Sequence, residues 1–223
     1  MDYEIYDLGL IDFEKAWQFQ KDIFLKVKAG IYPSALIFCR HYPVITLGRL
    51  ARRDNILATG DELKIRGIKV LEIERGGEVT YHGPGQLTVY PIFNFRYLKK
   101  DICWFLRQLE RVIILSLADF GAKAGQRCGL TGVWVEESKI ASIGIAVKSW
   151  VSFHGLSINI KEGDLDNFRL IRPCGMDIKM VSLENAAGRT IQIDEVKDAL
   201  LDKFKQIGGL DDKSSFASLG RRN

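Results

Sequence analysis

Apolar positions along the chain switch between helical and strand spacing, with no linker-like stretch between the segments. Helical spacing predicts four helices, at residues 13–30, 61–66, 102–120 and 195–207. Residues suited to capping precede or open these segments: Asp12, Thr59, Asp101 and Asp194. Thr59 and Glu62 also have the spacing of a capping box, and Gly30 and Gly121 are placed to end the two long helices.

Alternating or continuous apolar runs predict the strands. We place them at residues 34–40, 44–48, 68–74, 86–95, 132–137, 139–148 and 150–160. The last three are joined by short polar turns, which is typical of an antiparallel meander. The segments therefore predict an α+β fold with mixed, largely antiparallel sheets and flanking helices. We expect one domain over residues 1–210 with a small C-terminal lobe, and a flexible polar tail over residues 211–223.

One segment breaks this pattern. The run RGGEVTYHGPGQLTVYPI, residues 75–92, has four glycines in its first eleven positions, at Gly76, Gly77, Gly83 and Gly85. A tight turn needs one or two glycines. The excess predicts that backbone lies close to a bound molecule at this point.

Composition narrows the class of protein. Of the 223 residues 47% are hydrophobic and 27% charged, which is typical of a soluble globular domain. A net charge of +4 is too small and scattered to indicate nucleic-acid binding, although it could assist docking to an acidic protein. No apolar run is long enough to span a membrane, and the acidic N-terminus is unlike a signal peptide. We expect a cytoplasmic protein with reduced cysteines.

Cys174 is the candidate nucleophile. It lies between Pro173 and Gly175, a turn that exposes a side chain rather than buries it. The sequence contexts of Cys39, Cys103 and Cys128 are those of small apolar residues.

A reactive cysteine needs a base or a nearby cation, because the thiolate is the reacting form. Three histidines could supply one: His41, His82 and His154. A lysine whose pKa is lowered by burial is the other choice, and Lys139 begins a strand rich in small residues. The chain has no phosphate-binding loop, no Gly-x-Ser-x-Gly elbow and no metal-ligand spacing. We therefore expect neither a metal nor another cofactor.

Four segments, taken together and in order, carry a resemblance to a known family. They are HYPVITLGR, RGGEVTYHGPGQLTVYPI, GVWVEESKIASIGIAVKSWVSFHGLSINI and RPCGM, spread from residue 41 to residue 176. In these segments the chain resembles the lipoyl(octanoyl) transferases, which have the fold of the lipoate and biotin protein ligases. Val181 stands where many members have threonine, outside the four segments.

The resemblance implies an octanoyl transfer from acyl carrier protein to a lysine of a lipoyl domain, through a cysteine thioester. The acceptors would be lipoyl domains of 2-oxoacid dehydrogenase complexes and the glycine cleavage H protein. Cys174 resembles the family's nucleophile, and Lys139 resembles the lysine that lowers its pKa and acts as acid and base. The implied wall of the acyl pocket comprises Arg75, Gly76, Gly77, Glu78, Val79, Thr80, Tyr81, His82, Ser142, Ile143, Gly144, Gly155, Leu156 and Ser157.

With that resemblance, the glycines would form a thin channel wall around the octanoyl chain. Gly83 and Gly85 would lie near its thioester end, and N–H groups of residues 142–144 could bind the oxyanion. Two other functions stay open. An ATP-dependent lipoate or biotin ligase would need no cysteine, so Cys174 and Lys139 argue against it. A non-catalytic acyl-binding protein would bind acyl groups equally well after Cys174→Ala.

Overall fold

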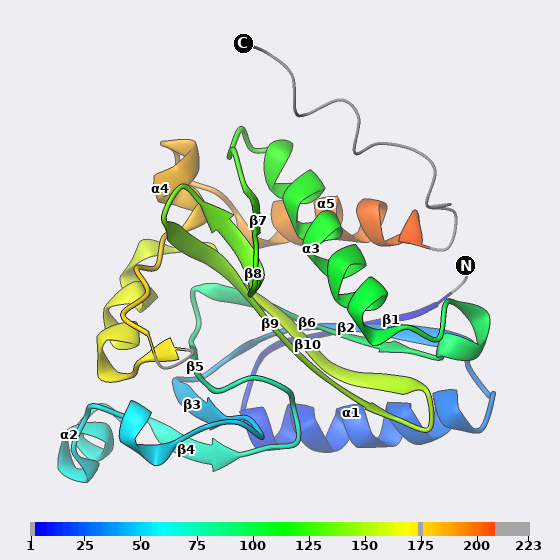
Figure 1. Ribbon diagram of the computed structural model, residues 1–223, viewed down its shortest axis with the longest axis horizontal. Coiled ribbons are helices and arrows are strands. Elements are labelled where there is room, and N and C mark those ends of the chain that lie inside the picture. The colour runs from blue at the N-terminus through cyan, green and yellow to red at the C-terminus, as the bar shows by residue number, and fades with distance from the viewer. Residues whose placement is uncertain (1–2, 174–175, 208–223) are drawn as a thin grey trace.

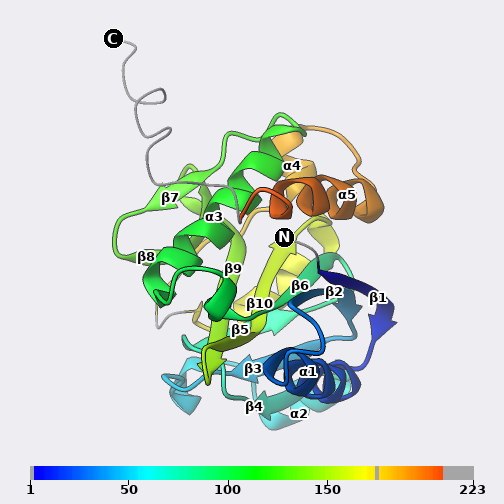
Figure 2. The ribbon, with the colours of Figure 1, turned by 90° about the vertical axis from the view of Figure 1, so that its right-hand side faces the viewer.

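The computed structural model describes residues 3–173 and 176–207. Its centre is a seven-stranded sheet with helices on both faces, as Figures 1 and 2 show. Helix α1 (Phe13–Lys28) covers one face, and helices α3 (Ile102–Ala118) and α5 (Ile193–Phe204) cover the other. The predicted α+β class is confirmed.

The large sheet runs in the order β1-β2-β6-β10-β9-β8-β7. Its strands are β1 (Glu4–Ile11), β2 (Ser34–His41), β6 (Gln86–Phe93), β7 (Gly125–Arg127), β8 (Leu130–Val135), β9 (Ser138–Lys148) and β10 (Val151–Asn159). Only β1 and β2 pair in parallel, and every other neighbouring pair is antiparallel. The predicted meander of three strands is β8, β9 and β10.

A second, three-stranded sheet has the order β4-β3-β5. It consists of β3 (Val44–Leu47), β4 (Lys69–Glu72) and β5 (Val79–His82), and helix α2 (Gly60–Ile65) lies beside it in Figure 1. Strand β5 lies within the glycine-rich run, where no strand was predicted. Four residues between its glycine pairs form a strand, and all four are buried.

Helix starts follow the capping chemistry in most cases. Asp12, Thr59 and Asp101 each accept a hydrogen bond from a backbone N–H of the first turn, as predicted. The Asp194 prediction was wrong. Helix α5 begins two residues earlier, with Gln192 as its cap, and Glu195 completes a capping box through a 3.0 Å bond from Gln192 N.

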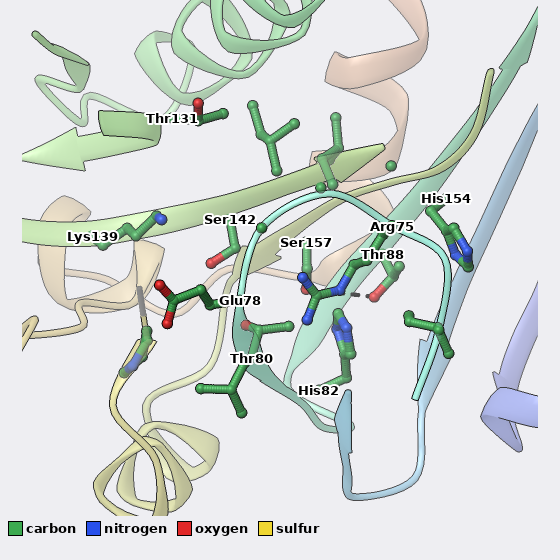
Figure 3. Close-up of a pocket in the computed structure, with 18 of the residues that line it drawn as sticks. Arg75, Glu78, Thr80, His82, Thr88, Thr131, Lys139, Ser142, His154 and Ser157 are labelled. Carbon is green, nitrogen blue, oxygen red and sulfur yellow. Dashed lines mark hydrogen bonds between the residues drawn. The ribbon is translucent and has the colours of Figure 1, made fainter. Parts of the chain in front are cut away.

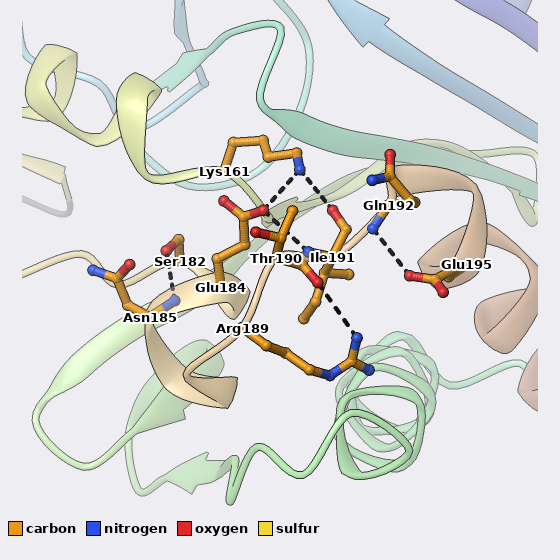
Figure 4. A network of polar contacts seen from close by, with 9 residues as sticks. All are labelled: Lys161, Ser182, Glu184, Asn185, Arg189, Thr190, Ile191, Gln192 and Glu195. Carbon is orange, nitrogen blue, oxygen red and sulfur yellow. Dashed lines mark hydrogen bonds and ion pairs between the residues drawn. The ribbon is translucent and has the colours of Figure 1, made fainter.

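A polar network fixes the chain between the sheet and helix α5 (Figure 4). Glu184, in helix α4 (Leu183–Ala187), accepts hydrogen bonds from Lys161 Nζ at 2.7 Å and from Ile191 N at 3.1 Å. Lys161 Nζ also donates to the Ile191 carbonyl at 2.7 Å. These bonds hold the start of α5 over the sheet.

The main hydrophobic core lies between the sheet and the α3–α5 face. Leu183, Val196, Leu200 and Phe204 from the C-terminal helices belong to it, together with Phe93 and Phe105. A separate cluster packs under α1. In the part of the chain that the structure describes, no helix has the length and apolar character needed to cross a membrane. The expected tail, residues 211–223, lies outside the described residues.

Candidate active site

A cavity of about 280 Å³ lies between the two sheets, near the lower end of the range for small-ligand pockets. It is lined by strand β5 and by neighbouring parts of β6, β8, β9 and β10. The predicted wall residues that line it are Arg75, Gly77, Glu78, Val79, Thr80, His82, Ser142, Ile143, Gly144, Gly155, Leu156 and Ser157. Lys139 lines the same cavity (Figure 3).

Two predicted wall residues are not among those that line the cavity: Gly76 and Tyr81. Gly76 donates its N–H to the Ile145 carbonyl at 2.8 Å, so it joins the 75–77 loop to strand β9. The Tyr81 ring contacts Phe168 on the other side of β5. Gly83 and Gly85 do not line the cavity either.

Lys139 is buried, with 4% of its surface exposed, although it is the second residue of its strand. Its ammonium lies 5.4 Å from the centre of the Trp134 ring, a cation–π distance. Its main chain is held by residues 179–181: Lys139 N donates to Lys179 O at 2.8 Å, and Val181 N donates to Lys139 O at 3.1 Å. The lysine is therefore fixed at both backbone and side chain.

Cys174, the predicted nucleophile, lies outside the described residues. The chain on both sides of it reaches the cavity, because Pro173 and Ile178 line it together with Lys139. Before this segment, Arg172 N donates to Asn55 O at 2.8 Å. The Asn55 side chain donates to Glu78 Oε2 at 2.7 Å, so the same residue also contacts the cavity wall.

Arg75 is buried beside the cavity, and its guanidinium is bound by neutral oxygen atoms. Its Nη2 donates to Thr46 O at 2.7 Å and to Thr46 Oγ1 at 3.0 Å, and its Nη1 donates to Gly76 O at 3.0 Å. These bonds hold the glycine-rich loop against strand β3. Arg75 therefore shapes the cavity wall as well as lining it.

The three histidines gather behind and beside the cavity. His82 and His154 line it, and the His41 ring lies 5.9 Å from the His82 ring. Burial lowers the pKa of His41 and of His154 to about 4 each. Burial also lowers the pKa of His82 well below its usual value, and repulsion from His41, when that ring is protonated, and from the Arg75 guanidinium lowers it further. All three are therefore neutral near pH 7.

His154 has a left-handed backbone, with φ of 55°, in the middle of strand β10. This geometry is costly for histidine and is held from outside the sheet, because Gln20 on α1 accepts a 3.0 Å hydrogen bond from His154 N. The ring Nε2 lies 3.3 Å from Glu74 Oε2. Helix α1 thus fixes one end of the cavity.

Sequence reasoning missed several lining residues. Thr88, Tyr90 and Trp134 come from strands that were predicted, but nothing local shows which faces of β6 and β8 meet the cavity. Leu130 and Thr131 precede the strand predicted at residues 132–137, because β8 begins two residues earlier. Phe13 and Ile73 also line the cavity. The alternation of strand side chains could have suggested Thr88 and Tyr90 together, because they lie two residues apart on one face of β6.

Comparisons with known proteins agree with this architecture. The family model described as the lipoyl protein ligase A/B catalytic domain matches residues 12–205. Lipoate-protein ligase A bound with ATP has a similar structure, with a TM-score of 0.76 at 18% identity, covering 96% of this chain and 89% of that one. A bipartite lipoate protein ligase from Thermoplasma acidophilum gives 0.73 at 18% identity, over 96% and 87%. At such identities the likeness shows the fold.

Relatives found by sequence identify the activity more narrowly than the structures do. An octanoyltransferase of Cytophaga hutchinsonii is 41% identical over 217 residues, covering 88% of each chain. An octanoyltransferase of Solibacter usitatus is 42% identical over 200 residues, covering 90% of each. The chain belongs to the lipoyl protein ligase A/B catalytic domain family, and within it to the octanoyltransferases, acyltransferases of protein lipoylation.

Proposed function

We propose that the protein moves an octanoyl group from acyl carrier protein to a lysine of a lipoyl domain, with Cys174 as the covalent carrier and Lys139 as acid and base. One observation carries the proposal. Buried Lys139 lines the same cavity as Pro173 and Ile178, which lie one residue before and four residues after Cys174 in the sequence.

In the first step, the Lys139 amine takes the proton of the Cys174 thiol, or the two rest as an ammonium and a thiolate. The thiolate attacks the thioester carbonyl of the donor and forms a tetrahedral intermediate. Collapse breaks the bond to the carrier sulfur, which leaves with the proton from the Lys139 ammonium. The octanoyl group is then a thioester of Cys174.

In the second step, the acceptor lysine attacks the Cys174 thioester as its neutral amine. The amide bond forms as the bond to Cys174 sulfur breaks, and Lys139 accepts the proton released from the amine. The cavity wall holds the octanoyl chain through both steps, so the reacting carbon stays at the lysine end of the cavity.

Strand geometry narrows the choice of oxyanion donor. Ile145 O accepts a hydrogen bond from Gly76, so the backbone groups of Ile145 point away from β10. Backbone direction alternates along β9, so the Ile143 N–H also points away from β10, where Ser142 and Gly144 bond to that strand. We propose that the Ile143 N–H, on the side of β9 away from β10, donates a hydrogen bond to the oxyanion of the intermediate.

The reaction needs no nucleotide, because the donor thioester is already activated. We propose an octanoyl carrier protein as donor, and lipoyl domains of 2-oxoacid dehydrogenases or the glycine cleavage H protein as acceptors; the similarity to octanoyltransferases supports this choice. We place the reaction in the cytoplasm, in keeping with free thiols at Cys39, Cys103 and Cys128.

The test is a transfer assay with purified octanoyl carrier protein and an apo lipoyl domain, in nucleotide-free buffer. We expect the lipoyl domain to gain one octanoyl mass at its target lysine without ATP. Transfer that requires ATP and free octanoate would instead support the ligase alternative, and binding without transfer would support the acyl-binding alternative.

A further inference from the structure

The two faces of strand β5 contact different parts of the molecule. Thr80 and His82 line the acyl cavity, and Tyr81 between them points to the opposite side, as alternation along a strand requires. There the Tyr81 hydroxyl accepts a 2.9 Å hydrogen bond from Asn167 Nδ2, and its ring meets Phe168 edge-on at 5.6 Å. Both partners belong to the 3-10 segment η3 (Glu162–Leu170).

Gly85 holds the beginning of the same segment. Its N–H donates to Asp164 Oδ2, and its carbonyl accepts hydrogen bonds from Ile160 N at 3.1 Å and Lys161 N at 3.0 Å. A Cβ on residue 85 would stand 2.8 Å from the Lys161 Cβ. Both backbone polar groups of this glycine are therefore used by the chain that enters η3.

The same segment leaves no room for a side chain at Gly83. A Cβ at this position would lie 2.5 Å from the Tyr81 hydroxyl and 2.6 Å from Asp164 Oδ2. The half-buried Asp164 carboxyl thus occupies the space that side chains at positions 83 and 85 would need. The close neighbour that these two glycines accommodate is η3, where sequence reasoning expected an acyl chain.

The end of η3 is anchored as well. Leu57 N donates to Leu170 O at 2.8 Å, Ile56 and Ile171 form an antiparallel bridge, and Arg172 N donates to Asn55 O. The next residue, Pro173, lines the cavity. The chain is therefore held from Ile160 to Arg172 before it reaches residue 174.

We propose that Tyr81, Gly85 and Asp164 are positioning residues, which hold η3 against β5 and so fix the chain as far as Pro173, the residue before Cys174, relative to the acyl wall on the other face of the same strand. This inference rests on the proposed function, because it assigns Cys174 as the group to be placed. It gives the second half of the glycine-rich run a role distinct from acyl binding.

The consequence is a separation of two properties. Loss of the Asp164 contact would loosen η3, which leads to Pro173, and would leave Thr80 and His82 in place, so acyl binding should persist while the reactivity of the Cys174 thiol falls. A displacement of about 1 Å costs on the order of 10²-fold in rate when it misplaces a reacting group. A residue that only shaped the acyl pocket would change binding instead.

The experiment measures alkylation of Cys174 by iodoacetamide against pH, resolved by peptide mass spectrometry, beside calorimetric binding of octanoate. Its variants are Asp164→Ala, which removes the acceptor, and Asp164→Asn, which keeps an oxygen acceptor for Gly85 N–H. Asp166→Ala is the matched control, since Asp166 is exposed on the same segment and pairs only loosely with Arg169, at 3.9 Å. Tyr81→Phe keeps the ring against Phe168 and tests the proposal independently if Asp164→Ala unfolds.

We expect the wild-type thiol to titrate below the usual value of about 8.5, and Asp164→Ala to raise that pKa and slow alkylation at pH 7 by at least tenfold. Octanoate affinity should stay within about twofold, and Asp164→Asn and Asp166→Ala should behave like the wild type. An Asp164→Ala or folded Tyr81→Phe variant with a wild-type pH profile would overturn the positioning role. An ordinary thiol pKa in the wild type would overturn the proposed function, and this inference with it.

Discussion

The side chain of Lys139 lies directly over Gly132. A Cβ built on residue 132 would stand 2.5 Å from Lys139 Cε and 3.1 Å from its Nζ, and the φ angle of Gly132 is 128°. Gly132 N also donates to the buried carboxyl of Glu110 at 3.0 Å, which ties this point of β8 to helix α3. The position of the lysine ammonium therefore depends on the absence of a side chain at residue 132.

Gly132→Ala should consequently displace Lys139. We expect octanoyl transfer to fall by about 10²-fold, since a shift of ~1 Å in a reacting group has that cost. The control is Gly121→Ala, where φ is 83° and nothing lies within 4 Å of an added Cβ, so that variant has backbone strain alone. Transfer rates and melting temperatures of both variants separate the effects. Equal transfer by the two variants would refute the contact argument.

Replacement of Lys139 by arginine separates charge from proton transfer. Arginine keeps the cation but does not release its proton near neutral pH. We expect acylation and transfer each to fall by roughly 10²–10⁴-fold, the usual contribution of a positioned acid or base. Stopped-flow measurement of both steps checks this. Near-wild-type rates for Lys139→Arg would limit the lysine to stabilising the thiolate.

Gly77 offers a test of the glycine-rich wall. Its φ is 80°, so alanine there is strained whatever occupies the cavity, and the nearest atom to an added Cβ is Arg75 Nη1 at 3.5 Å. We expect Gly77→Ala to lower the melting temperature and to slow butanoyl and octanoyl transfer by similar factors. A loss confined to the longer chain would show instead that the wall narrows around the distal methylenes.

The buried histidines predict acid sensitivity. A histidine whose pKa is lowered on folding contributes stability that is present above its unfolded pKa, about 6.5, and is lost as pH falls toward its folded pKa. For His41 and His154 the folded pKa is about 4, and burial also lowers that of His82. Each can therefore reduce the free energy of unfolding by up to about 1.4 kcal/mol per pH unit in this window.

Urea unfolding at several pH values between 6.5 and 4.5 checks this slope. Most carboxylates are still ionised in that range, so the histidines dominate it. His82→Leu removes one titrating group. It should lower the slope of unfolding free energy against pH by up to about 1.4 kcal/mol per pH unit. A stability that stays flat from pH 6.5 to 4.5 would contradict the neutral assignment of these side chains.

Local signals in the sequence predicted much of the fold. Side chains cap α1, α2 and α3 within three residues of themselves, so Asp12, Thr59 and Asp101 could be identified without tertiary information. Strand β1 could not, because most of its residues are exposed or half-buried and Gly9 interrupts its apolar pattern. Strand β5 was not predicted because its four residues lie between glycines and owe their burial to both sheets.

The site was predicted by motif, and its geometry depends on contacts between distant segments. Nothing near Lys139 in sequence shows that residues 179–181 will hold its backbone or that Trp134 will cover its ammonium. For Tyr81 the motif gave the wrong location. The motif grouped it with the acyl wall, and only the strand's alternation and the position of η3 show that it faces away from the cavity.

The central claim is that residue 174 carries the acyl group. Intact-mass analysis after incubation with octanoyl carrier protein tests it most directly, with wild type and Cys174→Ala treated in parallel. We expect wild type to gain one octanoyl group that hydroxylamine removes, as for a thioester, and Cys174→Ala to gain none while keeping its melting temperature. An octanoyl adduct that persists in Cys174→Ala would contradict the account.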